Sequence, residues 1–581
     1  MTSGSERGFP KLRSGSSSSN RDTMLNNMRI GRILSEFIGT SLGPLGMRKL
    51  ILDQDRELIA TNDGSMLLRR LDYMGIAPPV AKMIIEAAMA QEQEFGDGGI
   101  STVLLSGELL SKAEELIKAG FHPAVIISGY KNALRKALQI MKECSISITL
   151  ENKRMLEALV RTSMKSNFPQ EECEYLKHLI LDAAFKVAEL NGENHSLDLD
   201  YVKIISMAGG SVKDSKLVEG VVLDKKGLDP GVPKLVKNAR IALLNTPIEI
   251  SEAKMVKLNA KTLISSPQNL RTFLEERRNI LRKIAEKFVS IGANVVISSE
   301  RIDEAVLYYL ARRNVMTIRW ARKLDLRRIS RATGAKILSK PDEITERDLG
   351  RAELVEELKI GNDKMIFVKC SSHSKAVTII VRGASRIIAE EAEKTIKKGL
   401  HTIRSVLEDC RVVCGGGAIE LELASRLRKY AYTIAGKEQI VVQKFAEALE
   451  AIPMQLAKSA GMDPIDTLAT LRALHEEGER YAGIDVLKAT IGDMLSREIV
   501  EPFTVKENIL KTAVEAALMI LKVDDVLLTG KQLREKKEED ETIKEIYESC
   551  RKLELKLGRE LRRDYEKVAL SDTWKWKPSR R

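Results

Sequence analysis

Apolar residues recur at helical spacing through the first part of the chain, from about Asp22 to Lys142. Apolar side chains three and four residues apart are typical of an amphipathic helix with one buried face. The first helix is predicted to end at Gly39–Gly46, where three glycines and a proline fall within eight residues. Two strand-like runs follow, Lys49–Asp53 and Glu57–Thr61, before the helical pattern returns. This part of the chain is therefore predicted to be a helical domain with one short pair of strands.

The middle of the chain has a different pattern, in which short β-rich apolar runs alternate with helical segments. This alternation is typical of an α/β unit. The predicted strands are Val202–Met207, Ile241–Leu244, Val295–Ser298, Met316–Trp320 and Ala376–Arg382. One long amphipathic helix, Gln268–Ile291, lies among them, and after Gly383 the pattern is helical again to about Leu528. Because both ends are rich in helix, the pattern predicts a multi-domain α+β protein whose helical domain is assembled from both ends of the chain.

Length and composition narrow the classes of function. The chain has 581 residues, enough for several domains, and 44% of them are hydrophobic. Its net charge is +12, but acids are interleaved with the bases, which is typical of a solvated surface with ion pairs. There is no run of about 18 apolar residues that would indicate a membrane span, and Met1–Asn20 lacks the apolar core of a secretory signal. The six scattered cysteines favour reduced thiols in a cytosolic protein over a zinc site.

The C-terminal segment 531–581 is a charged, helical stretch that ends with Trp574 and Trp576 between lysines. Tryptophans among basic residues can stack on nucleic-acid bases. A solvated tail or a partner-binding segment explains the same pattern, so nucleic acid is not the favoured partner.

The candidate chemistry centres on Phe95–Thr102, where Asp97 stands between two glycines just before a helical pattern. Glycines let the backbone approach a ligand closely, and the free amides at a helix start favour an anion. An acid among these groups fits a ligand for a phosphate-bound magnesium ion. The same residues also fit an ordinary turn with Asp97 as a local cap. Likewise, Asp63 in Thr61–Gly64 fits either a site residue or a simple helix N-cap.

Several stretches that contain glycines and acids follow one another between about Asp22 and Leu528, in an order that is shared with one protein family. They are Gly39–Met47, Thr61–Gly64, Gly96–Gly98, Gly107–Leu110, His122–Pro123, Ala332–Ala335, Gly415–Gly417, Ala460–Asp466, Gly483–Val486, Asp493, Glu501–Pro502 and Lys522–Asp525. With these stretches the chain resembles the group II chaperonins, which comprise the archaeal thermosome and the subunits of the eukaryotic cytosolic chaperonin. The resemblance implies an ATP-binding subunit of a cytoplasmic double ring that encloses unfolded proteins, beside identical or paralogous subunits.

The resemblance also implies three domains, since the family combines a helical equatorial domain, an α+β intermediate domain and an α/β apical domain with a helical protrusion. The expected equatorial segments are residues 22–149 and 401–530, the intermediate segments 150–218 and 371–400, and the apical segment 219–370. Residues 1–21 and 531–581 are expected to be a flexible N-terminal tail and a charged C-terminal tail. The helix after Pro267 would be the protrusion.

The resemblance implies ATP and Mg²⁺ as ligands and carries residue roles onto this sequence. The loop Leu42, Gly43 and Pro44 and the stretch Gly98, Gly99, Ile100 and Ser101 would lie against the phosphates. Asp97 would bind the metal and Asp63 would help to hold the attacking water. Gly416 and Gly483 would approach the nucleoside, and Asp493 would lie beside the ribose.

Four positions depart from the family pattern. Gly99 and Ile100 stand where the family has threonines, and Asn167 stands where it has a lysine near the γ-phosphate. Counting back from Gly415, Lys398 stands where an intermediate-domain aspartate activates the hydrolytic water. A lysine does not accept the proton of water at neutral pH, so we expect ATP hydrolysis to be weakened.

Two alternatives stay open at this point. If the count is displaced by one helical turn, another acid, such as Glu391 or Glu393, activates the water. The chain could also be a non-hydrolysing scaffold or binding protein, derived from a chaperonin, that no longer assembles closed rings.

Overall fold

The computed structural model describes residues 20–52, 58–61, 63–73, 78–164, 168–191, 194–224, 228, 231–249, 267–361, 363–370 and 374–523. The chain divides into two compact units, Leu25–Lys522 and a second that combines Met1–Met24 with Val523–Arg581. The predicted C-terminal tail with Trp574 and Trp576, nearly all of the N-terminal tail, and Asn167 lie outside the described residues. The architecture below is that of the unit Leu25–Lys522.

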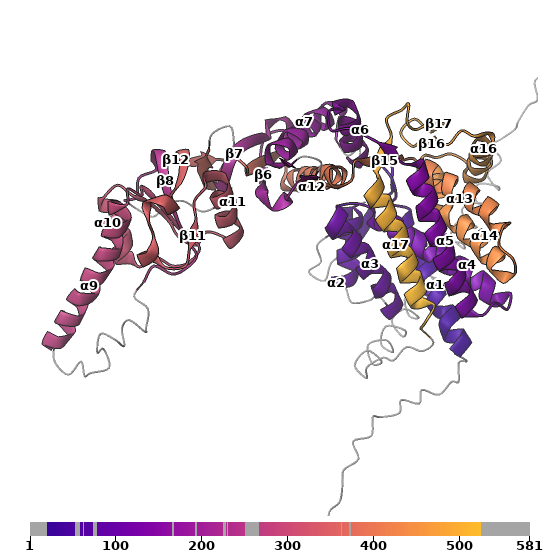
Figure 1. Ribbon diagram of the computed structural model, residues 1–581, viewed down its shortest axis with the longest axis horizontal. Helices are drawn as coiled ribbons and strands as arrows, with labels where there is room; N and C mark the ends of the chain where they lie inside the picture. The colour runs from indigo at the N-terminus through magenta and orange to yellow at the C-terminus, as the bar shows by residue number, and fades with distance from the viewer. Residues whose placement is uncertain are drawn as a thin grey trace, which may run out of the picture. The chain divides into compact units, whose positions relative to one another are not determined.

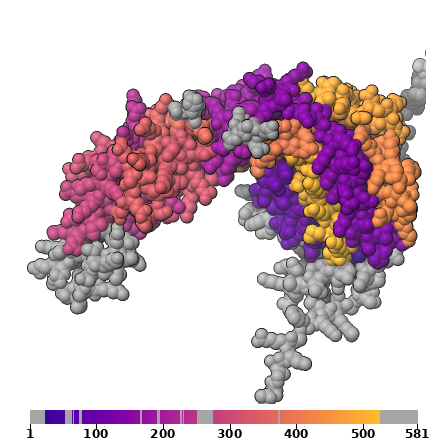
Figure 2. Space-filling model, in the orientation of Figure 1, coloured from indigo at the N-terminus to yellow at the C-terminus, as the bar shows by residue number. Residues whose placement is uncertain are grey.

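Helices from both ends of this unit pack into one body (Figures 1 and 2). The first group is α1 (Asn20–Gly39), α2 (Gly64–Tyr73), α3 (Pro79–Phe95), α4 (Gly99–Lys118) and α5 (Pro123–Cys144). The second group is α13 (Ala418–Ala431), α14 (Lys437–Leu449), α15 (Ala451–Ser459), α16 (Pro464–Glu477) and α17 (Phe503–Ile520). Helix α4 is buried on nearly all sides between α3, α5, α14 and α17, because it is apolar around most of its circumference. The predicted assembly of a helical body from both ends is thus seen in the packing.

The helical body also contains short strands, which form two hairpins and one small sheet. The antiparallel hairpin β1 (Lys49–Leu52) and β2 (Leu58–Thr61) matches the predicted pair of strands. A second antiparallel hairpin joins β16 (Ala482–Asp485) to β17 (Thr490–Asp493). A three-stranded sheet pairs β15 (Arg411–Cys414) with β3 (Ile146–Ser147) and with β18 (Val500–Pro502), so it joins segments from both ends of the unit.

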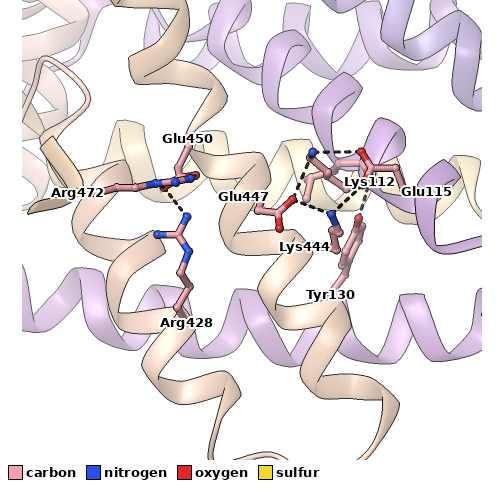
Figure 3. A network of polar contacts seen from close by, with 9 residues as sticks. Lys112, Glu115, Tyr130, Arg428, Lys444, Glu447, Glu450 and Arg472 are labelled. Carbon is pink, nitrogen blue, oxygen red and sulfur yellow. Dashed lines mark hydrogen bonds and ion pairs between the residues drawn. The ribbon is translucent and has the colours of Figure 1, made fainter. Parts of the chain in front are cut away.

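Charged side chains join the helices of this body at two places (Figure 3). The residues are Lys112, Glu115, Lys444 and Glu447 at the first, and Arg428, Glu450 and Arg472 at the second. At the first place, two lysines and two glutamates from α4 and α14 lie 2.8 to 3.4 Å apart. At the second, one buried carboxylate between α14 and α15 accepts from arginines on α13 and α16. These ion pairs link α4 to α14, and they link α13 and α16 to the junction of α14 and α15.

The middle of the chain forms a mixed nine-stranded sheet whose main path runs β10-β9-β8-β12-β13-β7-β14-β6, with β11 beside β8. The strands are β6 (Val202–Ala208), β7 (Lys216–Leu223), β8 (Leu235–Leu244), β9 (Val295–Ser298), β10 (Met316–Ile318), β11 (Ile337–Leu338), β12 (Gly350–Ile360), β13 (Asp363–Lys369) and β14 (Val377–Gly383). Strands β8 to β11 pair in parallel, whereas β12, β13 and β7 pair antiparallel. The predicted strand Met316–Trp320 ends at Ile318 instead, and Trp320 has a left-handed φ of 61° that a strand does not allow.

Three helices from the middle of the chain pack on the sheet around β8 to β12, namely α9 (Pro267–Ser290), α10 (Glu304–Arg312) and α11 (Lys323–Thr333). Helix α9 matches the predicted long amphipathic helix, and Leu281, Ile284 and Phe288 of its C-terminal half are buried against α10 and the sheet. Packing therefore explains that half of its apolar face. Leu270, Phe273 and Leu274 belong to the part whose side chains the structure does not describe.

A third cluster of buried apolar residues lies among α6 (Lys153–Ser163), α7 (Gln170–Val187), α12 (Arg386–Glu408) and strands β6 and β14. A small hairpin, β4 (Glu189–Asn191) and β5 (Asn194–Ser196), follows α7. Ile396, Leu400 and Ile403 of α12 are buried in this cluster, and other residues of the same helix approach α3 and α17 of the helical body. The domain division predicted above places one boundary, 218/219, inside β7 and another, 400/401, inside α12.

Candidate functional site

The loop between α3 and α4 begins the site. Helix α3 ends at Gly96, whose φ of 74° is left-handed, and Gly98 is left-handed too at 96°. Space also demands glycine, since a Cβ built on Gly96 would lie 2.7 Å from the Cβ of His401 on α12. Gly98, without any side-chain cap, occupies the N-cap position of α4. The interpretation of Asp97 as a local helix cap is therefore wrong, because a residue one position later begins the helix.

Asp97 and Asp63 meet at the side chain of Lys398 on α12. The Lys398 Nζ lies 3.1 Å from Asp63 Oδ1 and 3.8 Å from Asp97 Oδ1. The side chains of Lys398 and Asp63 are only 12% and 16% exposed, whereas that of Asp97 is 46% exposed. Lys394, one turn earlier on α12, lies 4.0 Å from Asp63 Oδ2. Two lysines of one helix face thus reach the two acids that the sequence singled out.

The charge of Lys398 is strongly favoured at this place. Burial by itself would lower the pKa of Lys398, but the carboxylates of Glu92, Asp97 and Asp63 outweigh burial and raise that pKa above its ordinary value. The side chain is therefore an ammonium ion at neutral pH and has no lone pair with which to accept a proton.

The main chain of Asp63 begins α2, since its carbonyl accepts a hydrogen bond from Leu67 N at 3.0 Å. Its carboxylate faces α12, as the contacts with Lys398 and Lys394 show. The two interpretations of Asp63, as a site residue and as a helix N-cap, both stay open, because the ion pairs with α12 do not conflict with a cap. Asp63 is thus held by the start of a helix with its acid directed at the same point as Asp97.

Residues Gly99, Ile100 and Ser101 form the first turn of α4, whose amides have no acceptor within the helix. Ile100 is buried, and a Cβ built on Gly64 would lie 2.6 Å from its Cγ1, so Ile100 packs against Gly64, the residue after Asp63. Only its backbone amide can serve a ligand. The amide of Gly99 already donates to Glu92 Oε1 on α3 at 3.2 Å.

Glu92 and His401 were not singled out by the sequence. Glu92 stands one helical turn before Gly96, and this spacing is the signal that could have placed it beside the loop. His401 follows Lys398 on α12, and its Nδ1 lies 3.3 Å from the carbonyl oxygen of Glu94. Burial lowers the pKa of His401, so its imidazole is neutral at pH 7.

The second group of predicted residues comes from the C-terminal half. Gly416 has a left-handed φ of 62°, and a Cβ there would lie 2.6 Å from the carbonyl oxygen of Ile484. The Ile484 amide donates to the carbonyl of Gly416 at 2.9 Å, which places Gly483 against the glycine loop. Asp493 pairs with Ala482 across β16 and β17, and its Oδ1 accepts from Leu495 N at 2.8 Å. Gly416, Gly483 and Asp493 are thus neighbours.

The loop Leu42, Gly43 and Pro44 follows α1, and the carbonyl of Leu42 accepts from Ser459 Oγ on α15 at 3.2 Å. The same helix reaches the glycine loop, since a Cβ on Gly417 would lie 2.7 Å from Pro453. Helix α15 therefore links the Leu42–Pro44 loop to the group around Gly416.

The alternative acids on α12 have different surroundings. Glu393 is paired with Lys397 at 2.7 Å. Glu391 lies seven residues before Lys398, on the same helix face by periodicity, so it stays an alternative proton acceptor.

The whole chain can be compared with known proteins. The model of the TCP-1/cpn60 chaperonin family matches residues 34–531. The chain belongs to the chaperonin family. It is 42% identical over 507 residues to a thermosome subunit of Methanopyrus kandleri, covering 87% of this chain and 92% of that protein. It is also 42% identical over 536 residues to thermosome subunit alpha of Sulfurisphaera tokodaii, covering 90% of this chain and 95% of that protein.

A solved chaperonin structure agrees with this assignment. The open-state monomer of a group II chaperonin from Methanococcoides burtonii superimposes with a TM-score of 0.56 at 36% identity, covering 74% of this chain and all of that one. The chain is therefore a group II chaperonin subunit with the chaperonin fold, as its sequence motifs predicted. The described part of this chaperonin has no helix long and apolar enough to cross a membrane.

The carboxylate and the backbone amides around Asp97 are groups that suit a magnesium nucleotide. Two neighbouring charged side chains, however, oppose its binding. Carboxylate oxygens are ligands that Mg²⁺ prefers, and helix-start amides suit a phosphate. However, Lys398 places a positive charge beside Asp97, where Mg²⁺ would bind, and Glu92 places a negative charge at the Gly99 amide. Both ions would have to be displaced or accommodated.

Proposed function

We propose that this chaperonin subunit binds Mg²⁺ and ATP, hydrolyses ATP slowly, and works in a double ring that encloses unfolded proteins in the cytoplasm. The observation that carries the slow hydrolysis is the 3.1 Å contact between Lys398 Nζ and Asp63 Oδ1.

The residue roles follow from the groups present. Asp97 would hold Mg²⁺, which when bound offsets the negative charge of the phosphates. The amides from Gly98 to Ser101 and the Leu42–Pro44 loop would hold the phosphates. Gly416 and Gly483 would lie against the nucleoside. Asp493 would reach a ribose hydroxyl with Oδ2, since its Oδ1 already accepts from the backbone.

The same geometry explains why hydrolysis should be slow. Attack on a phosphate by water needs a group that positions the water and accepts its proton. Asp63 could position the attacking water, but its carboxylate is paired with Lys398. The raised pKa of Lys398 keeps the lysine protonated, so Lys398 cannot accept the proton of the water. Loss of a general base typically costs about two to four orders of magnitude in rate. A subunit of this kind can still bind nucleotide beside active paralogues.

Ring assembly is supported by exposed apolar side chains in one stretch of the sequence. They lie on α1, the loop after it and β1, and are Ile33, Phe37, Leu45, Met47 and Leu50. Groups of exposed apolar residues commonly mark a protein contact. Closed rings need head-to-tail contacts, in which one surface of a subunit meets a different surface of the next. The partners would be identical or paralogous subunits, with unfolded proteins as clients.

The test combines sedimentation with nucleotide assays on the purified chain, alone and mixed with a paralogous subunit if the source encodes one. A ring sediments far ahead of a 64.8 kDa monomer, which is what a stand-alone scaffold would give. We expect ring-sized particles, ATP binding by calorimetry and turnover about two orders of magnitude or more below that of an active subunit. A monomer that binds no ATP would refute the proposal.

A further inference from the structure

The side chain of Glu92 accepts a hydrogen bond from the first backbone amide of α4. Its Oε1 accepts the hydrogen bond of Gly99 N at 3.2 Å, although Glu92 belongs to the preceding helix. Helix-start amides carry partial positive charge and favour an anion, so the carboxylate is stabilised there. The position is the one where the proposed function requires a phosphate oxygen.

The absence of a side chain at residue 99 makes this contact possible. A Cβ on Gly99 would lie 2.6 Å from the Cγ of Glu92 and 2.8 Å from its Oε1, much closer than packed atoms approach. A larger residue at position 99, such as the threonine of the family pattern, would therefore displace the carboxylate. Glu92 and Gly99 form a matched pair, in which the long acid uses the room that the glycine leaves.

The charges around the pair belong to one cluster, in which three carboxylates surround the ammonium group of Lys398. The Glu92 carboxylate and Asp97 act on Lys398, which is paired with Asp63 as well. In the structure an internal carboxylate thus stands at the helix start and an internal ammonium stands beside the magnesium-ligand candidate. Each provides part of the charge that a magnesium nucleotide would bring.

We propose that Glu92 is an internal competitor of the nucleotide, which holds the Gly99 amide until a phosphate oxygen displaces it and thereby sets the affinity for ATP. This inference rests on the proposed function and deepens it, because it assigns control of nucleotide affinity to a residue that the sequence analysis did not single out. If a site is free for only a fraction of the time, its apparent affinity for the ligand is reduced in proportion to that fraction.

The test is calorimetric titration of the full-length chain with Mg-ATP. Glu92→Gln keeps the shape of the side chain but removes its charge, and Glu92→Ala removes the competitor. We expect Kd to fall about tenfold in Glu92→Gln and by at least as much in Glu92→Ala, because one charged hydrogen bond at a helix start is lost by the competitor. Glu94→Gln is the matched control, since it removes one exposed charge from the same helix; its Kd should stay within about twofold of the wild type.

A second variant tests the pair with the acid intact. Gly99→Ala places a Cβ against Glu92 and should also tighten Mg-ATP binding severalfold while the carboxylate is still present. Thermal unfolding checks that each variant is folded. Adenosine, which has no phosphate, should bind the wild type and Glu92→Gln equally.

The outcomes separate the inference from the proposed function. If the wild type binds Mg-ATP and the Glu92 variants bind it equally or more weakly, Glu92 is no competitor, although the nucleotide site stands. If neither the wild type nor any variant binds Mg-ATP, the nucleotide site itself is refuted. Equal tightening of adenosine binding would show a change in the pocket as a whole and would also refute the competitor role.

Discussion

Replacement of Lys398 by aspartate tests the central feature of the site. The change removes the ammonium ion that lies 3.1 Å from Asp63 and 3.8 Å from Asp97, and it puts a further carboxylate beside them. Removing one partner of a largely buried ion pair costs about 3–5 kcal/mol. The lower end applies here, because Asp97 is 46% exposed and its pairing is screened by water. Lys398→Asp should therefore be less stable without metal, and Mg²⁺ should restore more stability to it than to the wild type.

The same replacement should raise hydrolysis. An aspartate at position 398 supplies a proton acceptor next to Asp63 and removes a positive charge that would pair with the γ-phosphate of bound ATP. Since a general base contributes about two to four orders of magnitude, we expect a gain of about a hundredfold, the lower limit. Gly99 and Ile100 still depart from the family pattern, so the gain should be partial. Adding Asn167→Lys to Lys398→Asp should give more than either change alone, because groups that act as a unit are not additive.

The assay is steady-state phosphate release at saturating Mg-ATP, together with thermal unfolding with and without Mg²⁺. Lys397→Asp is the matched control, since Lys397 is the adjacent, exposed lysine and pairs only weakly through its contact with Glu393. Its turnover should equal that of the wild type. Brisk hydrolysis by the unmodified chain that is abolished by Asp63→Ala, yet indifferent to residue 398, would refute the reasoning and point to Glu391.

Three further predictions concern the metal, the pH and the sheet domain. Asp97→Ala should weaken calorimetric binding of Mg-ATP more than that of metal-free ATP; equal losses would contradict a magnesium role. The lowered pKa of His401 means that folding stability should fall as pH drops below about 6.5, because the unfolded chain then binds a proton that the folded chain resists. His401→Gln should flatten this part of a stability–pH curve measured by thermal unfolding. A fragment of residues 219–370 contains nearly all residues of the two cores around the sheet, so it should unfold cooperatively in urea; a gradual transition would count against it.

Local patterns were sufficient for the long helices and for some of the strands. Helices such as α4 and α9 follow from the periodic spacing of their apolar residues, which reflects one buried face. Strands β9 and β14 follow from short β-branched runs that are buried on both faces. These features depend on neighbours in the chain, so they can be predicted without knowledge of the fold.

Strand β12 shows what local patterns did not reveal. Its residues Ala352–Lys359 are rich in Glu and Leu, which are good helix formers, and no strand was predicted there. In the structure the strand pairs with β8 on one side and with β13 on the other. The hydrogen bonds and packing of both neighbours outweigh a propensity of a few tenths of a kcal/mol per residue.

Part of the candidate site could also be predicted from the sequence, and part depends on the tertiary structure. The glycine and acid loops carry the family order, so the chaperonin assignment and the candidate roles of Asp63 and Asp97 could be drawn from the sequence. The contact of Lys398 with both acids, and that of Glu92 with Gly99, depend on how α12 packs against α3 and on the room left by a missing side chain. Such contacts join segments far apart in the chain, and their distances are set by the packing of whole helices rather than by any local pattern.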